Sequence, residues 1–157
     1  MLKSRRGHSL AELIVVVVII AVMSVVAVPR FSRAMVGRTT AETTAYTLMT
    51  DLRLTRSMAI RDAATNDKGY SLELTGASPY SGYTIENCKT HTVIATHTFH
   101  SGVTVNCPGA KKFVYVPMGN LKPDESGTQI TVTGSGGTYT LTLDAMSATG
   151  IVKCTKS

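Results

Sequence analysis

Cysteine is the most reactive residue type in this sequence, and its three copies, Cys88, Cys107 and Cys154, all lie in the second half of the chain. Three thiols form at most one disulfide among themselves, so at least one thiol is left over. An antiparallel strand pair spanning residues 92–106 would bring its two ends together, which predicts a Cys88–Cys107 disulfide. Cys107–Cys154 is the alternative pairing, and three free thiols are a further alternative.

The remaining polar residues form no pattern typical of catalysis. Three histidines near Cys107 match no established zinc spacing: His91, His97 and His100. Asp124 and Glu125 stand in a stretch with the composition of a turn rather than as a paired acid and base. The sequence has no nucleophile elbow, phosphate-binding loop or metalloprotease motif. We therefore expect no catalytic residue, no metal and no cofactor, and a protein that is not an enzyme.

The positive charge of the chain is concentrated at its start. Lys and Arg number 16 against 10 Asp and Glu, a net charge of +6, and Lys3, Arg5 and Arg6 supply half of that excess. Without the first seven residues the excess is +3, which is modest for a protein that follows the phosphates of DNA. The basic balance therefore does not by itself predict nucleic-acid binding.

Directly behind these basic residues lies the longest apolar run of the sequence, residues 13–28, interrupted only by Ser24. As a helix, residues 10–28 would be about 28 Å long, enough to cross the hydrocarbon core of a bilayer. The preceding basic residues favour a cytoplasmic N-terminus. A secretory signal fits less well, because the run is long and residues 29–33 make a poor cleavage site. The sequence therefore predicts a single transmembrane segment.

Glu12 is the residue that a plain membrane anchor does not explain. A carboxylate in a membrane helix costs about 2–3 kcal/mol or more on insertion scales. Either Glu12 lies near the helix end and reaches the interface, or it has a positively charged partner, most simply on another copy of this segment. The second alternative makes the segment an assembly surface as well as an anchor.

Together these residues resemble the class III signal of type IV pilins and type II secretion pseudopilins. The resemblance rests on Gly7, Glu12, the apolar run and Pro29. It implies that a prepilin peptidase cuts after Gly7, that the new N-terminus at His8 is N-methylated, and that Glu12 pairs with the N-terminus of a neighbouring subunit. Pro29 matches the proline that kinks the helix in this family. His8 stands where the family usually has Phe.

From residue 30 to residue 65 the sequence predicts an amphipathic helix with one apolar stripe. The stripe comprises Ala34, Ala41, Ala45, Leu48, Leu52, Ala59 and Ala63. The opposite, polar face carries arginines together with Glu42, Asp51 and Asp62. Such a stripe needs a sheet to cover it.

From Tyr70 onward the hydrophobic pattern has period two, which predicts strands. They are expected over residues 70–74, 83–85, 92–99, 103–106, 112–116, 129–133, 139–143 and 151–154. The fold class is α+β, a type IV pilin-like fold with a long N-terminal helix packed on an antiparallel β-sheet head. Its expected parts are a cleaved leader (1–7), a transmembrane and assembly helix (8–29), an amphipathic helix (30–65) and a periplasmic head (66–157).

Residues 48–60, 113–119 and 148–153 are similar to the GspH/FimT-type subfamily. This resemblance implies a minor pseudopilin of type II secretion or a minor pilin of a type IV pilus. The implied partners are other pilin or pseudopilin subunits, prepilin peptidase, the inner-membrane assembly platform and, before assembly, the lipid bilayer. The implied location is the bacterial inner membrane, single-pass, with the N-terminus cytoplasmic and the head periplasmic, and then a periplasmic or extracellular filament.

Some members of this subfamily bind DNA during uptake through a basic Gly-Arg-x-Arg motif, which gives a DNA-binding minor pilin as the alternative function. Residues 150–153 of this chain read Gly-Ile-Val-Lys and lack both arginines. The candidate DNA-contacting residues are Lys111, Lys112, Lys153 and Lys156. We prefer to interpret these lysines as ordinary solubilising charge.

Overall fold

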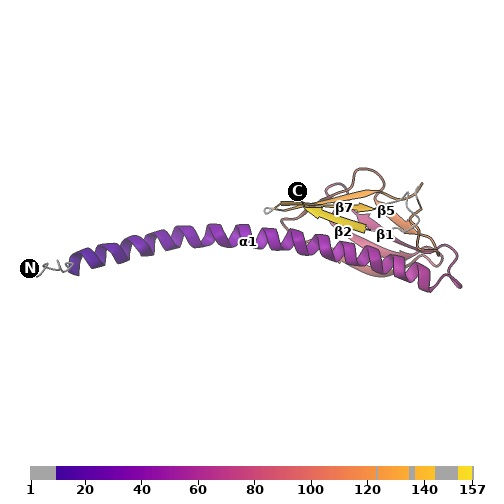
Figure 1. Cartoon of the computed structure of the whole chain (residues 1–157), viewed down its shortest axis with the longest axis horizontal. Helices are drawn as coiled ribbons and strands as arrows, with labels where there is room; N and C mark the ends of the chain where they lie inside the picture. Colours follow the sequence, from indigo (N-terminus) through magenta and orange to yellow (C-terminus); the bar gives the residue numbers. More distant parts are fainter. Residues whose placement is uncertain (1–9, 123, 135–136, 144–151, 157) are drawn as a thin grey trace, which may run out of the picture. The chain divides into compact units, whose positions relative to one another are not determined.

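The computed structural model describes residues 10–122, 124–134, 137–143 and 152–156, and over residues 26–38 it describes the backbone alone. The chain divides into two compact units, Met1–Val36 and Gly37–Ser157. The second unit holds all the strands and the later part of the helix (Figure 1). The cleaved leader that we expect at residues 1–7 lies outside the described residues.

One helix, α1, runs from Leu10 to Arg61. Its helical backbone continues through Pro29, so the expected transmembrane and amphipathic helices form one element. The proline ring has no N–H and removes one helical hydrogen bond there. At the other end the α-helix stops at Arg61, four residues before the expected end at Thr65. Hydrogen-bonded turns follow, with Asn66 N donating to Asp62 O over 2.8 Å.

In the described part of the chain eight strands follow the helix, close to the ranges predicted from the period-two pattern. They are β1 (Tyr70–Thr75), β2 (Gly82–Asn87), β3 (Thr92–Thr98), β4 (Thr104–Asn106), β5 (Lys112–Tyr115), β6 (Gln129–Gly134), β7 (Gly137–Leu143) and β8 (Val152–Lys156). The antiparallel pairing of β6 with β7 extends to Gly134 and Gly137.

The strands form two four-stranded sheets where we expected one. The first sheet has the order β3-β2-β1-β5 and the second has the order β4-β6-β7-β8, and all the pairings described are antiparallel. The chain changes sheets between β3 and β4, so β4 pairs with β6 rather than with its neighbour in sequence. A short antiparallel bridge between Tyr80 and Val105 links the two sheets.

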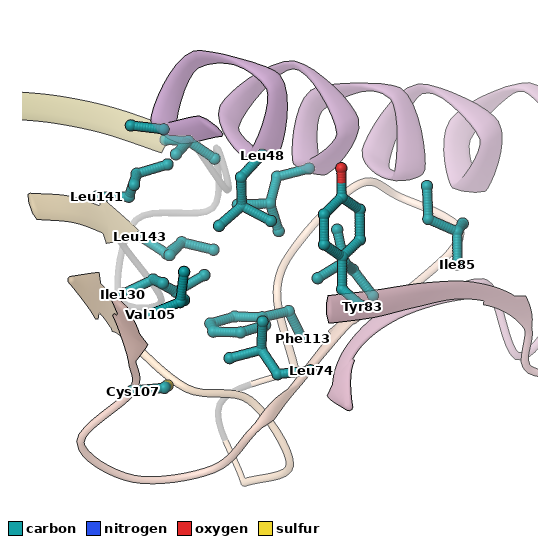
Figure 2. Close-up of a cluster of buried hydrophobic side chains, with 14 of the residues drawn as sticks. Leu48, Leu74, Tyr83, Ile85, Val105, Cys107, Phe113, Ile130, Leu141 and Leu143 are labelled. Atoms are coloured by element: carbon teal, nitrogen blue, oxygen red, sulfur yellow. The ribbon is translucent and has the colours of Figure 1, made fainter. Parts of the chain in front are cut away.

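A single hydrophobic core lies between the later part of α1 and both sheets. Figure 2 shows Leu48 of the helix above Phe113 and Leu74 of the first sheet and Ile130 and Leu141 of the second. Five of the seven residues of the predicted stripe are fully buried: Ala41, Ala45, Leu48, Leu52 and Ala59. Ala63 is exposed, contrary to our prediction, because the α-helix ends at Arg61. The side chain of Ala34 lies outside the described residues.

The three carboxylates expected on the polar face of the helix instead accept hydrogen bonds from strand tyrosines. The donor–acceptor pairs are Tyr139 Oη to Glu42 Oε2 (3.2 Å), Tyr83 Oη to Asp51 Oδ2 (2.5 Å) and Tyr70 Oη to Asp62 Oδ2 (2.5 Å). The first two bonds join α1 to β7 and β2, and the third joins the turn that follows α1 to β1, so both sheets are fixed to this part of the chain. A tyrosine combines a large apolar ring with a polar tip, which suits the margin of a core.

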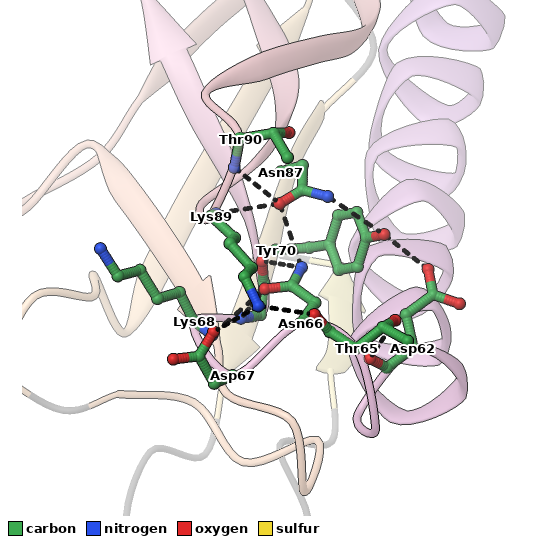
Figure 3. A network of polar contacts seen from close by, with 10 residues as sticks. Asp62, Thr65, Asn66, Asp67, Lys68, Tyr70, Asn87, Lys89 and Thr90 are labelled. Carbon is green, nitrogen blue, oxygen red and sulfur yellow. Dashed lines mark hydrogen bonds and ion pairs between the residues drawn. The ribbon is translucent and has the colours of Figure 1, made fainter.

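The turn between α1 and β1 is organised by the buried side chain of Asn66 (Figure 3). Its Nδ2 donates to Gly69 O (2.8 Å) and to Asn87 Oδ1 (3.1 Å), and its Oδ1 accepts from the backbone N–H groups of Lys68 and Gly69. Gly69 has φ = 73°, a left-handed conformation, and a Cβ at this position would lie 1.9 Å from Tyr115 O. Only glycine fits this position.

Leu52 gives a test of the core with a matched control two residues away. Leu52→Ala should lower the free energy of unfolding by about 2–5 kcal/mol, because it removes buried methyl groups and leaves a cavity. Leu54 is 49% exposed, so Leu54→Ala should change the stability by about 0.5 kcal/mol or less. Urea unfolding of the two variants, followed by circular dichroism, measures both effects. Equal losses would contradict the packing described.

Asp62 gives a test of pH dependence. Hydrogen bonds from Arg61 first, and from Tyr70 second, lower the pKa of Asp62 to about 2. A carboxyl group whose folded pKa is depressed contributes stability above its unfolded pKa of about 3.9, and loses it as the pH falls through the folded value. Asp62→Asn should therefore lose less stability than the wild type between pH 4 and pH 2. The urea midpoint as a function of pH measures this, with Asp124→Asn, an exposed loop carboxyl, as control.

Candidate functional site: the N-terminal helix and the reactive side chains of the head

The first turns of α1 expose an almost unbroken apolar surface on all sides. Every large apolar side chain from Leu10 to Val25 is at least half exposed, from 50% for Val16 to 77% for Leu10. The polar interruptions are Glu12 and Ser24, and the Ser24 hydroxyl donates to Ile20 O of its own helix (2.8 Å). An apolar surface of this extent marks a site of contact with another protein or with a membrane.

The finding on membrane spans is limited to the described residues. Among them, no helix meets the combined requirements of length and hydropathy for crossing a membrane. The transmembrane segment expected at residues 8–29 therefore stays a prediction.

Glu12 lies in the first turn of α1 with its side chain exposed. A negative charge is favoured at this end of a helix, because the partial positive charge of the helix dipole lies there. Gly7 and His8, the predicted cleavage site and new N-terminus, lie outside the described residues. The structure places Glu12 at the start of the apolar surface.

Residues 2–28 match the family model of the prokaryotic N-terminal methylation motif. The chain carries a type IV prepilin-like signal. This signal supports a subunit of the type IV pilin and pseudopilin class, which is a structural role rather than a catalytic one. It implies processing by prepilin peptidase and assembly with other pilin-like subunits. Searches of curated proteins and of solved structures found no match.

The methylation motif covers Gly7, His8 and Glu12 and ends one residue before Pro29. The match covers the first residues of α1 and does not extend to the head. The GspH/FimT-type resemblance, which rests on the head and on the later part of α1, stays a prediction.

All three cysteines belong to the described residues, and all three are free thiols in the structure. The geometric assumption behind a Cys88–Cys107 disulfide is wrong, because β3 pairs with β2 and β4 pairs with β6 in the other sheet. The ends of residues 92–106 are therefore not held together as a strand pair. Cys107 Sγ instead donates to the carbonyl oxygens of Ala110 (3.3 Å) and Gln129 (3.1 Å).

The alternative Cys107–Cys154 pair is also absent from the structure. Cys107 directly follows β4 at one edge of the second sheet, and Cys154 lies in β8 at the other edge. Two strands separate them, which amounts to roughly 14 Å at the usual strand spacing. A disulfide requires Cα atoms no more than about 7 Å apart.

The three histidines with which we considered a zinc site lie in three separate environments. His91 Nδ1 is 3.0 Å from Glu86 Oε1, and His100 Nδ1 is 2.7 Å from Ser101 O. His97 stacks on Tyr83 with 4.9 Å between the ring centroids. Over the described part of the chain, no group of three or more His, Cys, Asp or Glu side chains is placed to hold a metal ion.

The four lysines of the DNA-binding alternative divide between the two sheets. Lys111 and Lys112 lie at the start of β5 in the first sheet, whereas Lys153 and Lys156 lie in β8 of the second. Lys111 Nζ is 3.0 Å from Glu73 Oε1, and Lys156 Nζ lies 5.5 Å from the Tyr139 ring centroid. The sequence positions alone do not reveal this separation, and DNA binding stays a prediction.

Sequence reasoning missed a cavity of about 430 Å³ that brings Lys68, Lys112 and Lys122 together with Cys88 and His91. These residues come from a turn, a strand and two loops that are far apart in the sequence. The sequence held only a local signal for this cavity: Glu86 and His91 lie close together around the β2–β3 turn. In the structure His91 has φ = 55°. A residue other than glycine in this region of φ is uncommon.

Thiol labelling tests the cysteine arrangement. The denatured, unreduced chain should take up three alkyl groups, whereas a chain with one disulfide would take up one. In the folded chain Cys107 should react more slowly than Cys88, because Cys107 is buried and burial raises the pKa of its thiol. Mass spectrometry of the labelled peptides measures both the number and the order of reaction.

Proposed function

We propose that this protein is a minor pseudopilin or minor pilin, a structural subunit that enters a type II secretion pseudopilus or a type IV pilus through its N-terminal helix. The observation that carries the proposal is the methylation motif at residues 2–28, continued by a helix with exposed apolar side chains. The later part of the same helix is built into the core of the head. A subunit made in this way presents one polymerisation surface and one folded head.

In this proposal the leader ends at Gly7, and His8 becomes the methylated N-terminus. Before assembly the apolar helix lies in the inner membrane with the N-terminus cytoplasmic and the head periplasmic. In the filament the same side chains pack against the helices of other subunits. The apolar surface of residues 10–25 leaves water in both states, and its burial supplies about 25 cal/mol per Å².

Glu12 sets the position of the subunit in the filament. Its carboxylate pairs with the N-terminal amine of a neighbouring subunit, within an otherwise apolar contact. Removing one partner from a buried ion pair costs about 3–5 kcal/mol, because the remaining charge is left uncompensated. The similarity of residues 48–60 and 113–119 to the GspH/FimT type supports the assignment as a minor subunit. Pro29 belongs to the same assembly helix and matches the family's helix-kinking proline.

Substitution of Glu12 tests the proposal. Glu12→Ala should be cut by the peptidase like the wild type but should be lost from the filament fraction by at least about tenfold, since 1.4 kcal/mol is a factor of ten. Ser24→Ala is the matched control, because Ser24 lies on the same helix and its hydroxyl bonds only to its own helix in the structure. Immunoblots of membrane and sheared-filament fractions measure processing and incorporation. Normal incorporation of the Glu12 variant would contradict the pairing.

A further inference from the structure

The cavity of about 430 Å³ lies on the face of the first sheet that α1 does not cover. In β2, Tyr83 points toward α1 and bonds to Asp51, so Glu86, three residues later, points to the opposite face. Glu86, Lys112 and Val114 line the cavity from this face. The remaining lining residues come from the surrounding turns and loops: Asp67, Lys68, Cys88, His91, Val116, Lys122 and Glu125.

Each acidic residue of the cavity has a basic partner. Glu86 lies 3.0 Å from His91, Asp67 lies 3.2 Å from Lys89, and Glu125 pairs with Lys122. The last pair lowers the pKa of Glu125 and raises the pKa of Lys122. Lysines thus compensate Asp67 and Glu125, and Glu86 is compensated when His91 is protonated.

Two lysines of the cavity are left without an ion pair. Within the part of the chain that the structure describes, neither Lys68 nor Lys112 has a carboxylate oxygen within 4.0 Å. Lys112 pairs in register with Glu73, but Glu73 forms its ion pair with Lys111, at 3.0 Å. Lys112 is also half-buried, so water compensates its charge only in part. Among the described residues, Lys68 and Lys112 are thus the lysines of the cavity lining that no carboxylate holds in an ion pair.

A buried hydroxyl without a partner lies on the same sheet face. Ser71 of β1 pairs in register with Glu86 on one side and Val114 on the other, and cross-strand partners share a face. Its side chain is fully buried, and its Oγ has no hydrogen-bond partner in the structure. A buried polar group left unpaired destabilises the folded state unless a partner reaches it. This hydroxyl does not line the cavity itself, but it lies between two strand residues that do, Glu86 and Val114.

We propose that this cavity is a binding site for a small molecule carrying an oxyanion, a carboxylate or a phosphate group, held by Lys68 and Lys112. Ammonium groups donate strong, charge-assisted hydrogen bonds to such oxygens. The cavity is large enough for a ligand of several more atoms than the anionic group alone. The site goes beyond filament assembly, because it uses none of residues 1–36 and lies on the face away from α1.

Cys88 provides a reporter inside the cavity of the natural chain. The full chain in detergent is alkylated with neutral iodoacetamide at constant ionic strength, with inorganic phosphate in one arm and succinate in the other. Peptide mass spectrometry follows Cys88 and, as an internal control outside the cavity, Cys154. We expect at least one of the two anions to slow the labelling of Cys88 by at least about threefold and to leave Cys154 unchanged. The anion that slows the labelling of Cys88 shows whether the site prefers a phosphate or a carboxylate group. An unchanged Cys88 rate in both arms would overturn the proposal.

A neighbouring pair of lysines supplies matched variants. Lys112→Gln should raise the anion concentration for half-protection by about tenfold, because it removes one charge-assisted hydrogen bond to the anion. Lys111→Gln, one residue away and already paired with Glu73, should leave it unchanged. Equal effects of the two variants would refute a specific site. Lys68→Gln, an exposed position, should reproduce the Lys112→Gln effect, and unimpaired protection in this variant would also refute the site. If an anion protects Cys88 in a chain that does not enter filaments, only the proposed function is contradicted and the anion site stands.

Discussion

The contact between the later part of α1 and the two sheets is the interaction on which the whole head depends. Small side chains at Ala41, Ala45 and Ala59 let the helix approach the strands, and Leu48 and Leu52 fill the space between them. Neither sheet has another helix to cover its apolar face in the described part of the chain. A substitution that displaces α1 therefore exposes both sheets together.

Polar contacts at the edge of this interface fix the position of the helix along the strands and add to the stability of the contact. Tyrosine hydroxyls of β7 and β2 each donate to a carboxylate of α1, so the helix cannot slide by one turn without breaking both bonds. Tyr70 of β1 bonds in the same way to Asp62, directly after the helix. Two arginines add contacts to the backbone: Arg56 Nε donates to Gly119 O (2.9 Å), and Arg53 Nη2 lies 3.4 Å from Val152 O. Specific hydrogen bonds of this kind select one arrangement from several that would bury similar apolar area.

Local patterns in the sequence predicted the elements of the fold well. The apolar stripe identified the buried face of the helix, and the period of two identified the strands. Each of these signals depends on residues close together in the chain. The helix end at Arg61 was placed four residues too late, because the chain continues after it in hydrogen-bonded turns, with Asn66 N donating to Asp62 O.

Pairings between distant segments were harder to predict, and the candidate cysteine pair shows why. A Cys88–Cys107 disulfide required β3 and β4 to be neighbours, which is the commonest outcome for consecutive strands. Here the chain passes from one sheet to the other between them, and no residue in the connection signals this change. The same limit hid the partners of Asp51 and Asp62, since a carboxylate on a polar helix face looks solvent-exposed until a tyrosine from a strand is placed beside it.

The two faces of the first sheet show how one element serves two purposes. Leu72, Ile85 and Phe113 point toward α1 and exclude water, whereas Ser71, Glu86 and Lys112 alternate with them and point away. Because adjacent strand residues face opposite sides, the apolar face fixes where the polar side chains stand on the other. Lys112 is held in this way by its buried neighbour Phe113, and Glu86 by Ile85. The helix that would join this subunit to a filament thus also sets, through the sheet, the geometry of a cavity that it does not touch.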